Sequence, residues 1–261
     1  MRRDVEQPFE DAAVASLYDA FPFSEDLAFY GDLAAAQGRP VLELGCGTGR
    51  ILVPLAKAGH HVVGVDASPH MLAVAAGKLA SAGADVAARV RLVEADLRSL
   101  QLEERFDLAI VAVRTFAYLV TRDEQQEALG AIAAHLRPGG RLALDLLNPT
   151  PGWLARPAGS VRQDVFGELP SNGGTVARTD TMVSTDLATQ VRVIRSAYET
   201  AQNGSVRKHY VEWPFRYTYR FEAELLLERA GFEVEAVYGG YQREPFTSDS
   251  QVMLLVARRL A

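Results

Sequence analysis

The chain of 261 residues has a single cysteine, Cys46, and no long apolar run. One cysteine excludes an internal disulfide and any metal site built from several cysteines. No apolar stretch approaches the length of a membrane span, and residues 1–6 lack the apolar character of a signal peptide. These absences predict a cytoplasmic protein with neither a membrane nor a metal as partner.

Positive charge is also in short supply, because 27 Lys and Arg stand against 33 Asp and Glu, a formal net charge of −6. Domains that bind nucleic acid are usually basic, so this balance predicts no nucleic-acid partner. Residues 151–220 differ, with nine basic and six acidic residues. So mild an excess would suit a small acidic substrate rather than a polyanion.

What the chain does have is a dense glycine turn. Gly45, Gly47 and Gly49 follow a short apolar strand at 40–45 and precede helical spacing at 49–58. A strand, glycine turn and helix in this order place backbone N–H groups at a helix start, where a ligand can bind. The spacing does not fit the phosphate loop G-x-x-x-x-G-K-[ST], and it is tighter than the dinucleotide fingerprint G-x-G-x-x-G.

Three acidic residues accompany the turn. Glu43 precedes it, Asp66 ends a strand at 61–66, and Asp96 ends the next strand. A carboxylate at the end of the second strand can accept hydrogen bonds from both ribose hydroxyls, so Asp66 predicts an adenosine-containing cofactor. The additional carboxylates suit a pyrophosphate poorly. They suit a cationic ligand such as S-adenosylmethionine, which carries a sulfonium and an ammonium and no phosphate.

Four segments in this order and spacing resemble the class I S-adenosylmethionine-dependent methyltransferases: 43–49, 64–68, 95–97 and 136–140. The resemblance implies that the three glycines wrap the methionine end of the cofactor and that Asp66 holds the ribose. It implies that Ala67 and Met71 line the adenine slot and that Asp96 bonds the adenine amino group. The residues expected to contact the cofactor are Tyr18, Glu43, Gly45, Cys46, Gly47, Gly49, Asp66, Ala67, Met71, Asp96, Leu97 and Val113.

The predicted fold is α/β. Apolar strand signals near 40–45, 61–66, 90–95, 107–113 and 141–147 alternate with helical signals at 49–58, 68–82 and 123–136, which indicates a parallel sheet with helices on both faces. After residues 148–152 the period changes to two, with antiparallel strands at 175–183, 190–200 and 205–219. A helix at 221–230 and strands at 232–238 and 251–258 follow. The resemblance implies a Rossmann-like sheet of seven strands, mostly parallel, with the last strand antiparallel.

We therefore expect three parts in the chain. Residues 1–36, which are rich in aromatic side chains, would form an N-terminal helical lid. Residues 37–147 and 220–261 would form the cofactor-binding core. Residues 148–219 would form an inserted antiparallel β cap on the substrate side.

Methyl transfer from a sulfonium is an in-line displacement, so the acceptor should lie between the cofactor turn, the ends of the fourth and fifth strands and the cap. Tyr118 is the first candidate to orient the acceptor, because a tyrosine with a pKa near 10 is a poor base. His209 is the alternative base, although a histidine on a packed aromatic strand face is usually structural. Tyr18 is the third catalytic candidate. The candidate substrate-binding residues are Arg114, Tyr118, Asn148, His209, Trp213 and Arg216.

The predicted function is transfer of a methyl group from S-adenosylmethionine to a small-molecule O or N acceptor. The cap and the segment at 220–232 resemble the subgroup that methylates amino sugars and related metabolites. The Asp/Asn-Pro-Pro-Tyr/Phe motif of nucleobase N-methyltransferases does not follow the fourth strand. The alternatives are an RNA- or protein-directed methyltransferase, a non-catalytic cofactor-binding module and, against the glycine spacing, an NAD(P)-dependent oxidoreductase. The acceptor, and whether the protein is a monomer or a homodimer, stay open.

Overall fold

A seven-stranded sheet forms the centre of the computed structural model, which describes residues 9, 11–37, 40–169 and 174–261. The strand order is β10-β11-β5-β4-β1-β2-β3, and β11 alone runs in the direction opposite to the other six strands. The predicted Rossmann-like sheet is confirmed. Its strands are β1 (Val41–Leu44), β2 (Val62–Asp66), β3 (Val90–Glu94), β4 (Phe106–Val111), β5 (Leu136–Leu147), β10 (Phe232–Tyr238) and β11 (Val252–Arg259).

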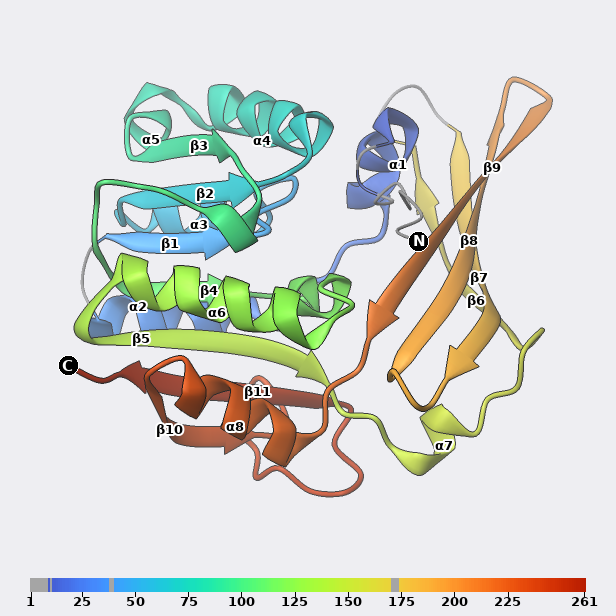
Figure 1. Ribbon diagram of the computed structural model, residues 1–261. Helices are drawn as coiled ribbons and strands as arrows, with labels where there is room; N and C mark the ends of the chain where they lie inside the picture. Colours follow the sequence, from blue (N-terminus) through green and yellow to red (C-terminus); the bar gives the residue numbers. More distant parts are fainter. Residues whose placement is uncertain (1–8, 10, 38–39, 170–173) are drawn as a thin grey trace.

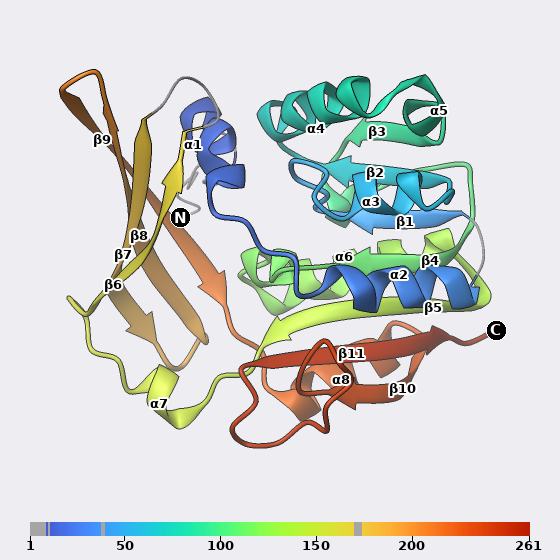
Figure 2. The same ribbon diagram turned by 180° about the vertical axis from the view of Figure 1, so that it is seen from behind.

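Helices cover both faces of this sheet because side chains alternate along each strand. On one face Leu42 and Leu44 pack with α6 (Arg122–His135) and α8 (Arg220–Arg229). On the other face Val41 packs with α2 (Leu27–Gln37), α3 (Leu52–Lys57) and α4 (Pro69–Ala82). Figures 1 and 2 show the two layers of helices, one on each face of the sheet, from opposite sides. Short elements follow α4, β3 and β4: α5 (Ala84–Ala87), η3 (Leu97–Ser99) and η4 (Thr115–Tyr118).

The N-terminal segment divides into two parts that serve different layers. α2 buries Phe29 and Tyr30 against the sheet, so this part of the expected lid is a layer of the core. α1 (Ala12–Leu17) and the 3₁₀ turn η2 (Tyr18–Ala20) lie instead beyond the carboxyl ends of the parallel strands, between the two sheets (Figures 1 and 2).

Local sequence signals explain where several elements begin and end. The Ser68 hydroxyl caps α4, with Pro69 in its first turn. Thr121 and Glu124 form a capping box at the start of α6. Asn203 and Gly204 both have positive φ, as a tight hairpin turn requires.

A second sheet of four antiparallel strands lies between β5 and α8 in the chain, in the order β6-β7-β8-β9. Its strands are β6 (Val161–Glu168), β7 (Thr175–Asp186), β8 (Val191–Gln202) and β9 (Ser205–Arg216), and a short helix α7 (Pro151–Leu154) precedes them. The sequence predicted three of these strands and missed β6 and α7. None of the helices in the described ranges has both the length and the apolar character to cross a membrane.

Candidate functional site

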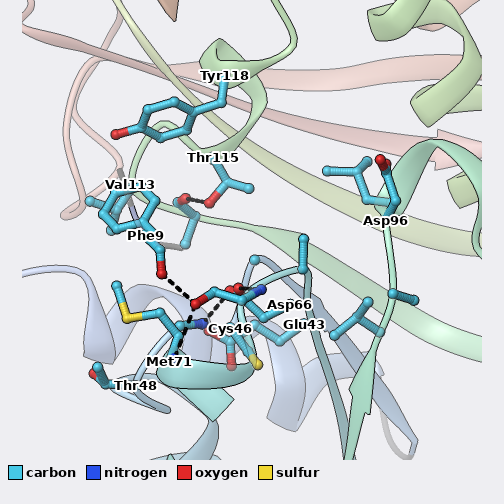
Figure 3. A pocket seen from close by; sticks show the side chains of 18 of the residues that line it. Phe9, Glu43, Cys46, Thr48, Asp66, Met71, Asp96, Val113, Thr115 and Tyr118 are labelled. Carbon is cyan, nitrogen blue, oxygen red and sulfur yellow. Dashed lines mark hydrogen bonds between the residues drawn. The ribbon is translucent and has the colours of Figure 1, made fainter. Parts of the chain in front are cut away.

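A cavity of about 230 Å³ lies at the carboxyl ends of β1 to β4, the position at which open α/β sheets bind ligands. The segments that follow these four strands form most of its wall, and Phe9 and Tyr18 close it from the N-terminal segment (Figure 3). The predicted residues that line it are Tyr18, Glu43, Gly45, Cys46, Gly47, Asp66, Ala67, Met71, Asp96, Leu97, Val113 and Tyr118. The cavity thus gathers most of the predicted cofactor residues.

The three glycines of the turn all adopt positive φ, but each does so in a different setting. A Cβ on Gly45 would lie 2.3 Å from Cγ2 of Thr115, whereas a Cβ on Gly47 would meet nothing within 4 Å. Gly47 also lines the cavity, so it leaves open space that a bound molecule can fill. A Cβ on Gly49 would lie 3.3 Å from Cβ of Ala75 in α4. Gly49 therefore permits close helix packing and does not line the cavity.

Asp66 ends β2 and faces the glycine turn. Its Oδ2 accepts from the Gly47 N–H at 2.8 Å and its Oδ1 from the Ser68 N–H at 2.9 Å. Burial raises the pKa of Asp66, while these two N–H donors act to lower it. The carboxylate does not cap α4, because the Ser68 hydroxyl accepts from the Met71 N–H. The same hydroxyl donates to the Phe9 carbonyl and so ties the N-terminal segment to the cavity (Figure 3).

Glu43 places a carboxyl group in the cavity wall, and this group is only 3% exposed. Its Oε2 has no hydrogen-bond partner among the residues that the structure describes. Burial raises the pKa of Glu43 to about 8, although nearby Arg50 lowers it. Arg50 is itself held by Asp26 through two hydrogen bonds of 2.5 and 2.7 Å. A buried carboxyl without a cation of its own is suited to a ligand that carries positive charge.

Asp96 also lines the cavity and already has a cationic partner. The Arg98 side chain donates to both carboxylate oxygens, and the Arg98 N–H donates to Oδ1 at 2.8 Å. These hydrogen bonds hold the pKa of Asp96 below its usual range. Arg98 also pairs with Glu124 at 2.7 Å. Neither Arg98 nor Glu124 was predicted, because nothing in the local sequence connects the turn after β3 to the start of α6.

The turn after β4 has an unusual backbone. Val113 and Arg114 both have positive φ, at 44° and 68°. Such a conformation costs on the order of 1–3 kcal/mol for each residue other than glycine and is found where the surrounding structure imposes it. The N–H and hydroxyl of Thr115 both donate to the Ala112 carbonyl, at 3.1 and 2.9 Å. Val113 and Thr115 line the cavity.

Aromatic rings separate the cavity from the four-stranded sheet. Phe9 lies edge-on to Tyr18 and Tyr118, with ring centroids 6.0 and 5.2 Å apart, and Tyr118 contacts Trp213 of β9 at 5.7 Å. Figure 3 shows Tyr118 and Phe9 on the side of the cavity away from Glu43. Burial raises the pKa of the Tyr118 hydroxyl above its ordinary value. Tyr118 is therefore a neutral hydrogen-bonding group at neutral pH and a poor proton acceptor.

Five predicted substrate residues lie outside the cavity wall. Trp213 packs behind Tyr118. His209 Nε2 lies 2.6 Å from Asp11 Oδ2 and joins β9 to the N-cap of α1. Asn148 donates to the Ser250 carbonyl at 2.8 Å. Arg114 is exposed.

Arg216 is the fifth of these residues and belongs to a buried polar cluster. It pairs with Glu222 of α8, and it donates to Gln125 of α6 at 2.8 Å and to Gln190 at 3.0 Å. Its side chain is buried and faces this cluster instead of an acceptor. Arg216 thus anchors the four-stranded sheet to the core. The period of two in the sequence predicted that Arg216 lies on a strand. Its partners could not be predicted, because the packing of α6 and α8 brings them to it.

Comparison with known proteins assigns the family. A family model described as a methyltransferase domain matches residues 41–140. The cypemycin N-terminal methyltransferase of a Streptomyces species is 33% identical over 227 residues, which cover 85% of this chain and 84% of the relative. The dTDP-3-amino-3,4,6-trideoxy-alpha-D-glucopyranose N,N-dimethyltransferase of Streptomyces venezuelae is 26% identical over 238 residues, covering 87% and 92%.

Solved structures match over the whole chain. The CcbJ methyltransferase from Streptomyces caelestis has a TM-score of 0.79 and 27% identity, covering 98% of this chain and 99% of that one. S-adenosylmethionine-bound CalS10, an amino pentose methyltransferase from Micromonospora echinaspora, has a TM-score of 0.71 and 25% identity, covering 99% and 100%. The chain therefore belongs to the class I S-adenosylmethionine-dependent methyltransferases. The predicted enzyme class and methyl donor are confirmed.

Proposed function

We propose that this enzyme methylates a free amine on a small molecule, such as an amino sugar or the N-terminus of a short peptide. The observation that carries the proposal is the aromatic wall of Phe9, Tyr18 and Tyr118, which offers no proton acceptor with a suitable pKa. No described residue of the cavity wall is a histidine or a lysine, and Glu43, whose pKa is raised to about 8, lies on the side of the cavity away from Tyr118 and Phe9. The printed activities of the cypemycin and amino-sugar relatives, both N-methylations, support the same class of acceptor.

The chemistry explains why the wall favours an amine. A neutral amine attacks the methyl carbon with its own lone pair, so the N–C bond forms as the S–C bond breaks. The positive charge then moves from sulfur to nitrogen, and the product ammonium releases a proton to water. A hydroxyl acceptor is a weaker nucleophile and requires a base in contact with it. Alignment against a desolvating wall is what an amine needs from this protein.

For the donor, we propose that Gly45 and Gly47 hold the methionine end and that Asp66 accepts from the ribose hydroxyls. The open space beside Gly47 and the unpartnered Oε2 of Glu43 fit a cofactor with an ammonium and a sulfonium. Ala67, Met71 and Leu97 would enclose the adenine, beside Asp96. S-adenosylmethionine supplies an already activated methyl group, so these residues need only bind and orient it.

For the acceptor, we propose that Tyr118 orients the amine by hydrogen bonding and that Trp213 supports the Tyr118 ring from the cap. Residues 148–219 would then form the substrate-side cap. Within residues 1–36, the lid function would belong to the part from Phe9 to η2, because α2 is a layer of the core. Residues 1–8 and 10 lie outside the described part of the chain.

The test offers the purified protein S-adenosylmethionine and paired acceptors. One pair is a nucleotide-linked amino sugar and its hydroxyl counterpart, and the other is a short peptide with a free or an acetylated N-terminus. Mass spectrometry should find added methyl groups only on the member of each pair that has a free amine. Methylation of the hydroxyl sugar or the acetylated peptide would refute the amine assignment.

Donor binding is tested separately by calorimetry with S-adenosylhomocysteine. The wild-type protein should bind it, and Asp66→Ala should bind it at least about tenfold more weakly, since a half-buried charged acceptor for two ribose hydroxyls is lost. Unchanged affinity in Asp66→Ala would show that the ribose assignment is wrong.

A further inference from the structure

Asp145 of β5 is a buried carboxylate that does not line the cavity. It is 1% exposed, and three donors converge on its Oδ2: the Tyr241 hydroxyl at 2.8 Å, the Val113 N–H at 3.3 Å and the Tyr30 hydroxyl at 3.5 Å. Its Oδ1 has no hydrogen-bond partner in the described ranges. A carboxylate buried in this way is unfavourable for stability compared with an apolar side chain of similar size. A structural role in the core alone therefore does not explain it.

One of the three donors is the backbone of the strained turn after β4. Val113 is β-branched and adopts a φ of 44°, where β-branched residues are genuine outliers. Strained backbone persists only when surrounding groups determine it. Thr115 closes the turn through the Ala112 carbonyl, and Asp145 binds the N–H at its first strained residue. Thr115 therefore holds the turn through the Ala112 carbonyl, and Asp145 holds it through the Val113 N–H.

The position of this turn decides the shape of the cavity. Thr115 occupies the space that a Cβ on Gly45 would need, which brings the turn into contact with the glycine loop. Val113 and Thr115 are in the cavity wall, and η4 carries Tyr118 three residues further along the chain. A shift at Val113 would thus move both the donor side and the acceptor side of the cavity.

We propose that Asp145, supported by Tyr241, is a positioning residue of the methyl-transfer site that holds the turn at 113–114 in its strained form. Tyr241 comes from the loop between β10 and β11, and its ring packs on Phe23 with centroids 5.7 Å apart. Asp145 and its three donors thus join the C-terminal loop, the N-terminal segment and the turn after β4. Burial raises the pKa of Asp145 to about 6, so the group is ionised above that pH and accepts strongly from Val113 and Tyr241. The catalytic part of this proposal rests on the proposed function, whereas its effect on donor binding does not.

The experiment compares Asp145→Leu and Asp145→Asn with a matched control, Leu144→Ala. Because all three donors converge on one oxygen, an asparagine can present its amide oxygen to the same donors, whereas leucine has a similar size and no acceptor. Leu144 directly precedes Asp145 on β5 and is also buried. Its side chain packs in the apolar core on the other face of the sheet, the face covered by α6 and α8. Its truncation should lower stability without removing a hydrogen bond to the Val113 N–H.

Calorimetry with S-adenosylhomocysteine and the amide resonance of Val113 in NMR spectra are the primary readouts. We expect Asp145→Leu to weaken binding about tenfold or more, as expected for loss of a charged hydrogen-bond acceptor, and to move the Val113 resonance. Asp145→Asn should retain most of the affinity. Leu144→Ala should bind like the wild type despite a lower melting temperature. With the amine acceptors above, Asp145→Leu should reduce kcat more than it changes the acceptor KM.

Wild-type affinity in Asp145→Leu with an unmoved Val113 resonance would overturn the proposal, as would equal weakening by Leu144→Ala. If Asp145→Leu does not fold, Tyr241→Phe gives the same test on a smaller scale. It removes the shortest of the three hydrogen bonds, and an unchanged Val113 resonance in that variant would count against the proposal. Failure of the proposed function would appear separately, as a wild-type protein that methylates no amine.

Discussion

Alanine substitutions at Gly45 and Gly47 separate the two reasons for which the cofactor turn contains glycine. Both residues have positive φ, 68° and 53°, where an alanine costs about 1–2 kcal/mol. Gly47 has open space around its missing Cβ, so Gly47→Ala should lower the free energy of unfolding by that amount alone. A Cβ on Gly45 would lie 2.3 Å from Cγ2 and 2.6 Å from Oγ1 of Thr115. Overpacking adds about 1–3 kcal/mol, which gives about 2–5 kcal/mol for Gly45→Ala.

A second substitution tests the source of the difference. Thr115→Ala removes both clashing atoms and leaves only Cβ, at 3.0 Å. The double variant Gly45→Ala/Thr115→Ala should therefore be more stable than the sum of the single effects predicts, by about 1–2 kcal/mol. The matched pair Gly47→Ala/Thr115→Ala should be additive within about 0.5 kcal/mol, because Gly47 does not contact Thr115.

Urea unfolding monitored by circular dichroism measures all five variants, and calorimetry with S-adenosylhomocysteine measures the site. Gly47→Ala should bind much more weakly than its small loss of stability suggests, because the new methyl group enters the space assigned to the cofactor. Two results would refute this reasoning: Gly45→Ala is no less stable than Gly47→Ala, or Thr115→Ala does not offset the loss of stability in Gly45→Ala. In either case the close contact between the glycine turn and the turn after β4 is not what makes Gly45 necessary.

Three other predictions concern charged groups. Burial raises the pKa of Glu43 from 4.5 to about 8, so the folded protein without ligand holds a proton that the unfolded chain has released. Its stability should fall as the pH rises through that interval, and Glu43→Gln should flatten the fall in urea titrations at several pH values. Arg216→Ala should lower the free energy of unfolding by about 3 kcal/mol, because it leaves Glu222 and a buried polar cluster unpaired; a loss below about 1 kcal/mol in urea would contradict this. His209→Ala should leave the rate of amine methylation largely unchanged and cost at most about 1 kcal/mol, since its pair with Asp11 is partly exposed; loss of the methylation rate would restore His209 as a base.

Most of the core could be predicted because its signals are local. Apolar runs marked the parallel strands, and helical spacing between them marked α3, α4 and α6. β6 was missed because its Arg162 and Gln163 break the apolar pattern, and as an edge strand it pairs only with β7. Such an edge strand is defined by its pairing with the neighbouring strand and not by an apolar pattern of its own. The same reason hid the role of α2, since nothing local states which surface a helix covers.

The methyl donor could be identified from residue types and their spacing. Gly45 and Gly47 follow β1 and Asp66 ends β2, and adjacent parallel strands bring these positions to one edge of the sheet. Their spacing therefore predicted a single site for an adenosine-containing donor. The partners of the charged residues, in contrast, became known only from the folded chain. Arg98 pairs with Glu124, His209 with Asp11 and Arg216 with Glu222, and Asp145 is bound by groups from three distant segments. The physical reason is that a charged side chain takes its role from what surrounds it, and those surroundings are set by strand order and helix packing.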